Sequence, residues 1–430
     1  MSLVLGAIAD DFTGATDLAN NLVRSGMRTV QILGDPTGKP LPEGVDAVVV
    51  ALKSRTCALD EALKDSLAAL DWLRGQGVRQ VFFKYCSTFD STAEGNIGPV
   101  ADALLERLGG RQTVMVPAFP TTGRTVYQGH LFVGDRLLND SGMQDHPLNP
   151  MTDADLVRVL GAQTSHTVGL VSHAVIRAGA EACRRRLGEL DASGVRHVIC
   201  DTLDDGDLDV LAAATVELPL VTGGSGLGQA LPAEYRRKGW LAPVEDAARL
   251  APAQGRSLVL SGSCSRATLA QVEHFLEHRP GFALDPLSLA QGDQPIAEAL
   301  DFVRRQHAES PDEPVLVYAS AAPDRVKAAQ QQLGVARAGE LVERALASLA
   351  TTLVAEGVGR LLVAGGETSG AVVSALSLDR LRIGPQIDAG VPWTQASVTA
   401  GTLSLALKSG NFGGIDIFTR GFAVLEEATR

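Results

Sequence analysis

Two adjacent carboxylates follow the first apolar run of the chain. Residues 3–9 are continuously apolar, as expected of a strand covered on both faces, and Asp10 and Asp11 come directly after them. Ligands of open α/β sheets bind beyond the carboxyl ends of the strands, where such a pair could bind a substrate hydroxyl or take its proton. An aspartate before Thr13 and Gly14 is also a common helix cap. The pair by itself leaves both interpretations open.

Cations and hydroxyls follow three further strand-like runs, at 45–52, 80–84 and 113–117. Because the carboxyl ends of parallel strands meet at one edge, we expect these side chains to lie near the aspartates. Arginine can bind a carboxylate with a two-pronged fork, and lysine supplies a point charge. The implied ligand is small, hydroxylated and anionic. The candidate contacts are Thr13, Ser54, Arg55, Lys84, Ser87, Asp90 and Arg124, with His146 in a nearby loop, although a lone histidine is more often structural.

Three loops of small residues mark the second half of the chain. Residues 261–265 and 364–370 each follow a strand-like run and precede a helical pattern, and 408–414 completes the set. Amides and hydroxyls at the start of a helix can bind phosphate. Neither a Walker motif nor a spaced Gly-x-Gly-x-x-Gly occurs at these loops. Together they favour a nucleotide site over plain turns.

Composition limits the functions that the chain can have. The net charge of −12 argues against general nucleic-acid binding, which needs a basic face, but a local basic cluster still allows an anionic ligand. No apolar run reaches the length of about 18 residues that a membrane span needs, and the N-terminal run is too short for a signal peptide. We therefore expect a cytoplasmic protein without membrane or nucleic-acid partners.

Strands alternate with helical patterns along the whole chain, which predicts two α/β domains with largely parallel sheets and an active site in the cleft between them. Helices are expected at about 15–25 and 57–75. The tract 222–228 is rich in glycine and is expected to be flexible. The domains are placed at 1–240 and 257–430, joined by a connection at 241–256 that is rich in proline, alanine and charge.

The combination of motifs resembles the four-carbon acid sugar kinase family over nearly the full length. The matching stretches are 10–15, 90–92 with 95–98, 117–120 with 123–124, 365–370 and 408–413. The resemblance implies an acid-sugar-binding N-terminal domain, a C-terminal domain that binds ATP, and Mg²⁺ to offset phosphate charge. It implies a catalytic aspartate, either Asp11 or Asp10. The implied ATP contacts are Ser261 or Ser263, Gly365, Gly366, Glu367, Thr368, Gly410, Asn411 and Gly413.

One position departs from the pattern of the threonate- and erythronate-type kinases. Glu94 stands where those members carry arginine, and this form resembles the members that phosphorylate 3-oxo-tetronate at its C4 hydroxyl. The alternatives are a D-threonate or D-erythronate kinase, a sugar-acid-binding protein without activity, or a dinucleotide-dependent oxidoreductase. A homodimer is compatible with an α/β enzyme of this size.

Overall fold

The computed structural model describes residues 3–145 and 149–429. Contacts within the chain divide it into two compact units, Met1–Ala247 and Ala248–Arg430. We call them the first and the second unit and describe each by itself. The predicted domain limits and the connection at 241–256 stay predictions. In the described parts of the chain, no helix combines the length and the apolar character that crossing a membrane requires.

The first unit is built on a parallel sheet with the strand order β2-β3-β1-β4-β11-β5-β10-β9. Every residue of the apolar strands β1 and β3 is buried, as their continuous hydrophobic sequence predicts. The strands are β1 (Leu5–Ala9), β2 (Thr29–Leu33), β3 (Ala47–Ala51), β4 (Gln80–Lys84), β5 (Thr113–Val116), β9 (Thr167–Val171), β10 (Val195–Cys200) and β11 (Leu220–Gly223).

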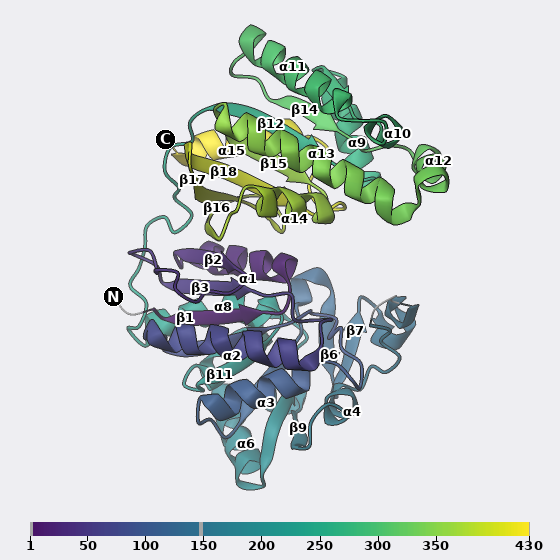
Figure 1. The fold of residues 1–430 in the computed structure, drawn as a ribbon. Helices are drawn as coiled ribbons and strands as arrows, with labels where there is room; N and C mark the ends of the chain where they lie inside the picture. The colour runs from purple at the N-terminus through teal and green to yellow at the C-terminus, as the bar shows by residue number, and fades with distance from the viewer. Residues whose placement is uncertain (1–2, 146–148, 430) are drawn as a thin grey trace. The chain divides into compact units, whose positions relative to one another are not determined.

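Helices cover both faces of this sheet. Helix α1 connects β1 to β2 toward one edge of the sheet, whereas α2 and α3 lead from β3 to β4 and from β4 to β5 toward the opposite edge. Because such crossovers are right-handed, α1 lies on one face of the sheet, and α2 and α3 lie on the other. In Figure 1, α2 and α3 run along one face, and α1 packs against α8. The helices are α1 (Phe12–Arg24), α2 (Leu59–Gly75), α3 (Ile97–Arg107), α4 (Leu156–Gly161), α5 (His173–Arg177), α6 (Ala180–Ala192), α7 (Asp205–Thr215) and α8 (Ser225–Arg237).

A small antiparallel sheet follows β5 and was not predicted. It consists of β6 (Arg124–Tyr127), β7 (His130–Val133) and β8 (Arg136–Leu137). Glycines with positive φ stand in its two turns, Gly129 at 75° and Gly134 at 63°. Arg124, a predicted substrate contact, is the first residue of β6 and so belongs to this small sheet.

The expectation that 222–228 is flexible was wrong. These residues form the end of β11 and the start of α8, and all are buried. A Cβ on Gly226 would lie 2.6 Å from the carbonyl oxygen of Ala118, and one on Gly228 would lie 2.3 Å from the side chain of Leu18. The glycines therefore serve close packing of α8 against its neighbours.

The second unit has a mixed sheet with the order β13-β14-β12-β15-β18-β17-β16. The first five strands pair in parallel, and β16 and β17 continue the sheet in antiparallel pairing that was not predicted. The tight turn between them contains Gly390 at φ 74°. The strands are β12 (Arg256–Ser261), β13 (Gly281–Ala283), β14 (Val315–Tyr318), β15 (Val358–Ala364), β16 (Arg380–Asp388), β17 (Val391–Val398) and β18 (Gly401–Lys408).

The helices of the second unit also form two groups. On one side α9 packs against α15, and on the other α10, α11, α12 and α14 contact the long helix α13, which lies along the sheet in Figure 1. Buried Trp393 packs against Phe422 in the core beneath α15. The helices are α9 (Arg266–Leu276), α10 (Pro286–Leu289), α11 (Gln294–Glu309), α12 (Pro323–Leu333), α13 (Val335–Ala355), α14 (Gly366–Ala375) and α15 (Ile417–Thr429).

Candidate active site

The carboxyl ends of β3, β1 and β4 meet at one edge of the first sheet. The register places Ala9 of β1 level with Ala51 and with Lys84 on its two neighbours. Backbone hydrogen bonds then join the loops, since Asp10 N donates to Lys84 O at 3.0 Å and Ser54 N donates to Asp10 O at 3.0 Å. Residues predicted from three separate loops are thereby brought together.

Arg55 lies among three aspartates at this edge. Its guanidinium donates to both oxygens of Asp10, from Nε to Oδ2 at 2.9 Å and from Nη2 to Oδ1 at 2.8 Å. Its Nη1 is 3.0 Å from Asp11 Oδ2 and 3.8 Å from Asp90 Oδ2. Arg55 is thus engaged by carboxylates of the protein itself, which makes it an organiser of the acids. Its direct contact with substrate stays a prediction.

Asp10 and Asp11 differ in accessibility, with side chains 4% and 31% exposed. Burial raises the pKa of the Asp10 carboxyl, and the hydrogen bonds from Arg55 oppose that rise. Burial would lower the pKa of Arg55, but its hydrogen bonds to Asp10 and the charges of both aspartates raise it above its usual value, so the guanidinium stays charged. Asp11 Oδ1 accepts from Gly14 N at 2.7 Å and caps α1. Asp11 is therefore both the helix cap and the more accessible acid.

The loop after β4 fixes the third aspartate. Thr88 Oγ1 donates to Asp90 Oδ1 at 2.6 Å, and Phe89 N donates to Cys86 O at 3.0 Å to close a tight turn. Buried Phe89 has φ 52°, a left-handed conformation that costs a bulky residue about 1–3 kcal/mol. The turn sets the direction from which Asp90 approaches Arg55.

The remaining predicted substrate contacts differ in their surroundings. Lys84 is buried and its Nζ donates to Tyr85 O at 2.7 Å. Thr13 is exposed in the first turn of α1, and Ser87 is partly buried after β4. Arg124 donates to the backbone carbonyl of Thr122 at the start of the hairpin. Predicted His146 lies outside the described residues. Substrate binding by these residues stays a prediction.

Asn96 supports the Arg55 loop, a role that sequence reasoning missed. Its buried amide donates from Nδ2 to Ser54 O at 2.8 Å and to Cys57 O at 3.1 Å. A buried amide with two backbone acceptors holds the loop on both sides of Arg55. The signal in the sequence was its place in the stretch 95–98, which matches the family pattern at the start of α3.

Replacing Arg55 by methionine should strongly destabilise the first unit. The change leaves Asp10 buried without its counter-charge, and breaking a buried pair from one side costs roughly 3–5 kcal/mol. Arg158→Met is the matched control, because Arg158 also joins two aspartates but is exposed. Urea unfolding should show a large loss for Arg55→Met and a much smaller one for Arg158→Met. Equal losses would contradict a special role for the buried cluster.

The three small-residue loops of the second unit meet at the carboxyl edge of its sheet. β15 lies between β12 and β18 in parallel pairing, so Ser261, Ala364 and Lys408 are level. Gly262 N donates to Ala364 O at 3.0 Å, and Gly365 N donates to Lys408 O at 2.8 Å. The loops predicted to bind a nucleotide are therefore joined to one another.

Close packing requires small residues at this junction. A Cβ on Gly410 would lie 2.6 Å from Ser263 Oγ, and one on Gly262 would lie 2.2 Å from Thr368 Oγ1. Two helices begin here, α9 after its cap Ser265 and α14 after Gly365. The positive partial charges of their N-termini favour a bound anion.

A cavity of about 510 Å³ lies beside these loops, within the usual size range of small-molecule sites. Its lining includes five of the predicted ATP contacts, namely Ser263, Gly365, Gly366, Glu367 and Thr368. Sequence reasoning missed its apolar side, because helical positions on α12 and α13 carry no motif. These positions are Val326, Ala329, Val335, Ala338 and Val342.

Other predicted ATP contacts do not line this cavity. Ser261 is buried and its Oγ lies 2.8 Å from Ser320 Oγ, so Ser263 is the better placed of the two candidate serines. Asn411 is exposed beyond Gly410. The carbonyl of Gly413 accepts from Gln271 Nε2 at 2.8 Å, which anchors the loop to α9. ATP binding by these residues stays a prediction.

Buried Lys408 holds the third loop in place. Its Nζ donates to Thr268 Oγ1 at 3.0 Å, to Ser409 O at 3.1 Å and to Gly410 O at 3.0 Å. Burial lowers the pKa of Lys408 to about 8. The ammonium group thus ties the Gly410 loop to α9 while placing a positive charge beside the phosphate-type loops.

Lys408 should make the stability of the protein depend on pH. Its pKa is about 8 when folded against an ordinary value of 10.5, so between these values the unfolded chain binds more protons than the folded one. The free energy of unfolding should therefore rise with pH across this window relative to a Lys408→Met variant. Denaturant unfolding of both proteins at several pH values measures the difference. A constant or falling difference would contradict a lowered pKa.

Comparison with known proteins places the chain in a family. Residues 5–231 match the sugar-binding N-terminal domain family, and residues 258–418 match the nucleotide-binding C-terminal domain family. A protein of Burkholderia multivorans named 3-oxo-tetronate kinase is 56% identical over 425 residues, covering 99% of this chain and 98% of its own. Another protein of that name, from Pseudomonas fluorescens, is 56% identical over 427 residues, which cover 98% of this chain and 97% of that protein.

A solved structure agrees with the fold. The crystal structure of a Haemophilus influenzae protein superposes with a TM-score of 0.88 at 45% identity, covering 98% of this chain and all of that one. The full-length relatives and the two matched domain families define the class of protein, a carbohydrate kinase. The chain belongs to the four-carbon acid sugar kinase family.

Proposed function

We propose that this protein is an ATP-dependent 3-oxo-tetronate kinase that transfers the γ-phosphoryl group of ATP to the C4 hydroxyl. The observation that carries the proposal is the meeting of three phosphate-type loops beside a cavity of nucleotide size. Relatives named for this activity, at 56% identity over nearly the full length, support the choice of substrate.

In the first unit, we assign Asp11 to the substrate hydroxyl. Asp11 is the more accessible of the two adjacent acids, and its Oδ2 lies beside Arg55. It orients the C4 hydroxyl and accepts its proton as the oxygen attacks phosphorus, a step that depends mainly on positioning and electrostatics. Buried Asp10 is a positioning residue that fixes Arg55 with two hydrogen bonds.

In the second unit, we assign the adenine to the apolar side of the cavity and the phosphates to the loops. The helix N-termini of α9 and α14 and the charge of Lys408 favour the phosphates. ADP leaves from this cavity after transfer. Because transfer joins atoms bound to different units, the reactive state must bring the two bound substrates together and exclude water.

The cavity also contains carboxylates that suit Mg²⁺. Glu343 and Glu367 both line it, and burial together with the charge of Glu367 raises the pKa of Glu343. Two carboxylates in a cavity beside a proposed phosphate site fit this ion, which binds through one or two carboxylates and substrate phosphates. We propose these two residues as its protein ligands. When bound, Mg²⁺ offsets negative charge on the phosphates.

A coupled ADP-release assay over four-carbon acids tests the proposal. The panel contains D-threonate, D-erythronate and the 3-oxo acids made from them in situ by dehydrogenases. We expect the highest kcat/KM with a 3-oxo-tetronate. A preference for threonate or erythronate would favour the alternative kinase, and no ADP release with any acid would favour a binding protein.

A homodimer and a cytoplasmic location belong to the same proposal, and light scattering tests the dimer.

A further inference from the structure

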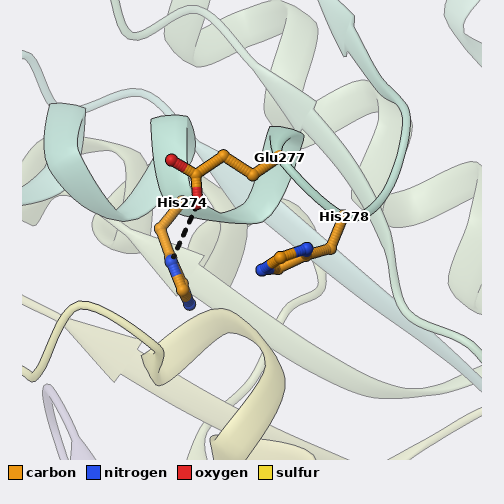
Figure 2. Close-up of side chains that lie close together, drawn as sticks. All are labelled: His274, Glu277 and His278. Carbon is orange, nitrogen blue, oxygen red and sulfur yellow. Dashed lines mark ion pairs between the residues drawn. The ribbon is translucent and has the colours of Figure 1, made fainter.

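A second group of side chains of the types that bind metal ions lies at the C-terminal end of α9, away from the cap Ser265 at which the helix begins. The cluster consists of His274, Glu277 and His278. The helix begins at Arg266, beside the loops, and its 11 residues span about 16 Å at 1.5 Å per residue. In Figure 2 both imidazole rings extend from the same side of the chain, and the Glu277 carboxylate lies next to His274. The cluster is therefore separate from the proposed ATP site.

The three side chains are close enough to share one ion. One ligand atom from each lies within 4.8 Å of the others, and His274 Nδ1 is 3.6 Å from Glu277 Oε2. A tetrahedral zinc ion with bonds of about 2.0–2.1 Å needs ligand atoms about 3.4 Å apart. The side chains are 29% exposed at His274 and 62% exposed at Glu277, so small rotations can bring the atoms to that spacing.

The backbone places these ligands where a cation is favoured. His274 lies in the last turn of α9, and His278 stands four positions further along, just past the end of the helix. Glu277 and His278 stand in the turn just after Leu276, where the helix ends and carries a negative partial charge. The neighbouring cation Arg279 is 2.6 Å from Glu313 through Nε, so its charge is balanced by another carboxylate.

We propose that His274, Glu277 and His278 form a surface binding site for a divalent transition-metal ion such as Zn²⁺. Two imidazoles and one carboxylate are typical zinc ligands and leave a fourth position for water. Mg²⁺ and Ca²⁺ prefer oxygen ligands and fit this set poorly. The proposal does not depend on the kinase activity, because the cluster and the ATP cavity share no residue.

Calorimetric titration with Zn²⁺ tests this site. The full chain is used without a histidine tag, after treatment with chelator, in a buffer free of ATP and phosphate at a pH of about 7.5, above the usual histidine pKa. We expect one ion per chain. His274→Ala and His278→Ala should each weaken binding at least tenfold, since even loss of a residue that supports a ligand typically costs about 10–100-fold.

Glu273→Gln is the matched control for Glu277→Gln. Both residues are exposed glutamates of the same segment, but only Glu277 belongs to the cluster. Binding should weaken in Glu277→Gln and stay unchanged in Glu273→Gln, with circular dichroism confirming that each variant is folded. The proposal is overturned if the wild-type chain binds no stoichiometric Zn²⁺, or if the His274→Ala/His278→Ala double variant binds it equally well.

Discussion

Asp11→Asn should lower kcat by at least about two orders of magnitude, the range typical of acid–base residues, with little change in stability. Asparagine can still cap α1, because its side-chain oxygen can accept the hydrogen bond from Gly14 N. It cannot accept the proton of the C4 hydroxyl. The ADP-release assay gives kcat, and thermal unfolding reports whether the variant is folded.

Two further variants make this test specific. Asp17→Asn removes the same charge from the same helix and should keep near-normal turnover. Asp10→Asn should instead lower stability, because it weakens a buried pair with Arg55. Near-normal turnover in Asp11→Asn would remove Asp11 as the base and leave Asp10 as the candidate.

Gly365→Ala should raise KM for ATP by more than tenfold and lower stability by about 1–3 kcal/mol, the cost of forcing a side chain into strained backbone. Gly365 has φ 125°, a conformation that favours glycine. An added Cβ would lie 3.0 Å from Thr368 Oγ1 and 3.2 Å from Ser263 N. The change would therefore displace two of the loops proposed to bind phosphate.

Gly370→Ala provides the comparison within the same segment. Gly370 lies in α14, and an added Cβ would meet no atom of the described chain within 4 Å. Alanine there should leave KM for ATP unchanged and slightly increase stability, because it favours helix. The loop assignment fails if both variants bind ATP as well as the wild type does.

Local sequence patterns predicted much of the architecture. The apolar runs at β1 and β3 are strands because buried parallel strands need apolar residues on both faces. Patterns failed where partners distant in sequence decide the outcome. The tract 222–228 was read as flexible because glycine alone cannot reveal that Ala118 and Leu18 pack against it. The helices α12 and α13 form the apolar side of the cavity through ordinary small residues, which no motif marks.

The sequence by itself determined which chemical groups stand at the carboxyl ends of the strands, because strand and turn signals are local. It placed Asp10, Asp11 and Arg55 at one edge of a parallel sheet. Only the tertiary structure decided how those groups interact. Arg55 is 45 positions from Asp10 in the sequence, and its guanidinium donates two hydrogen bonds to the Asp10 carboxylate. Those two donors are therefore not free for a ligand. Burial, which depends on the whole fold, separates the enclosed Asp10 from the accessible Asp11.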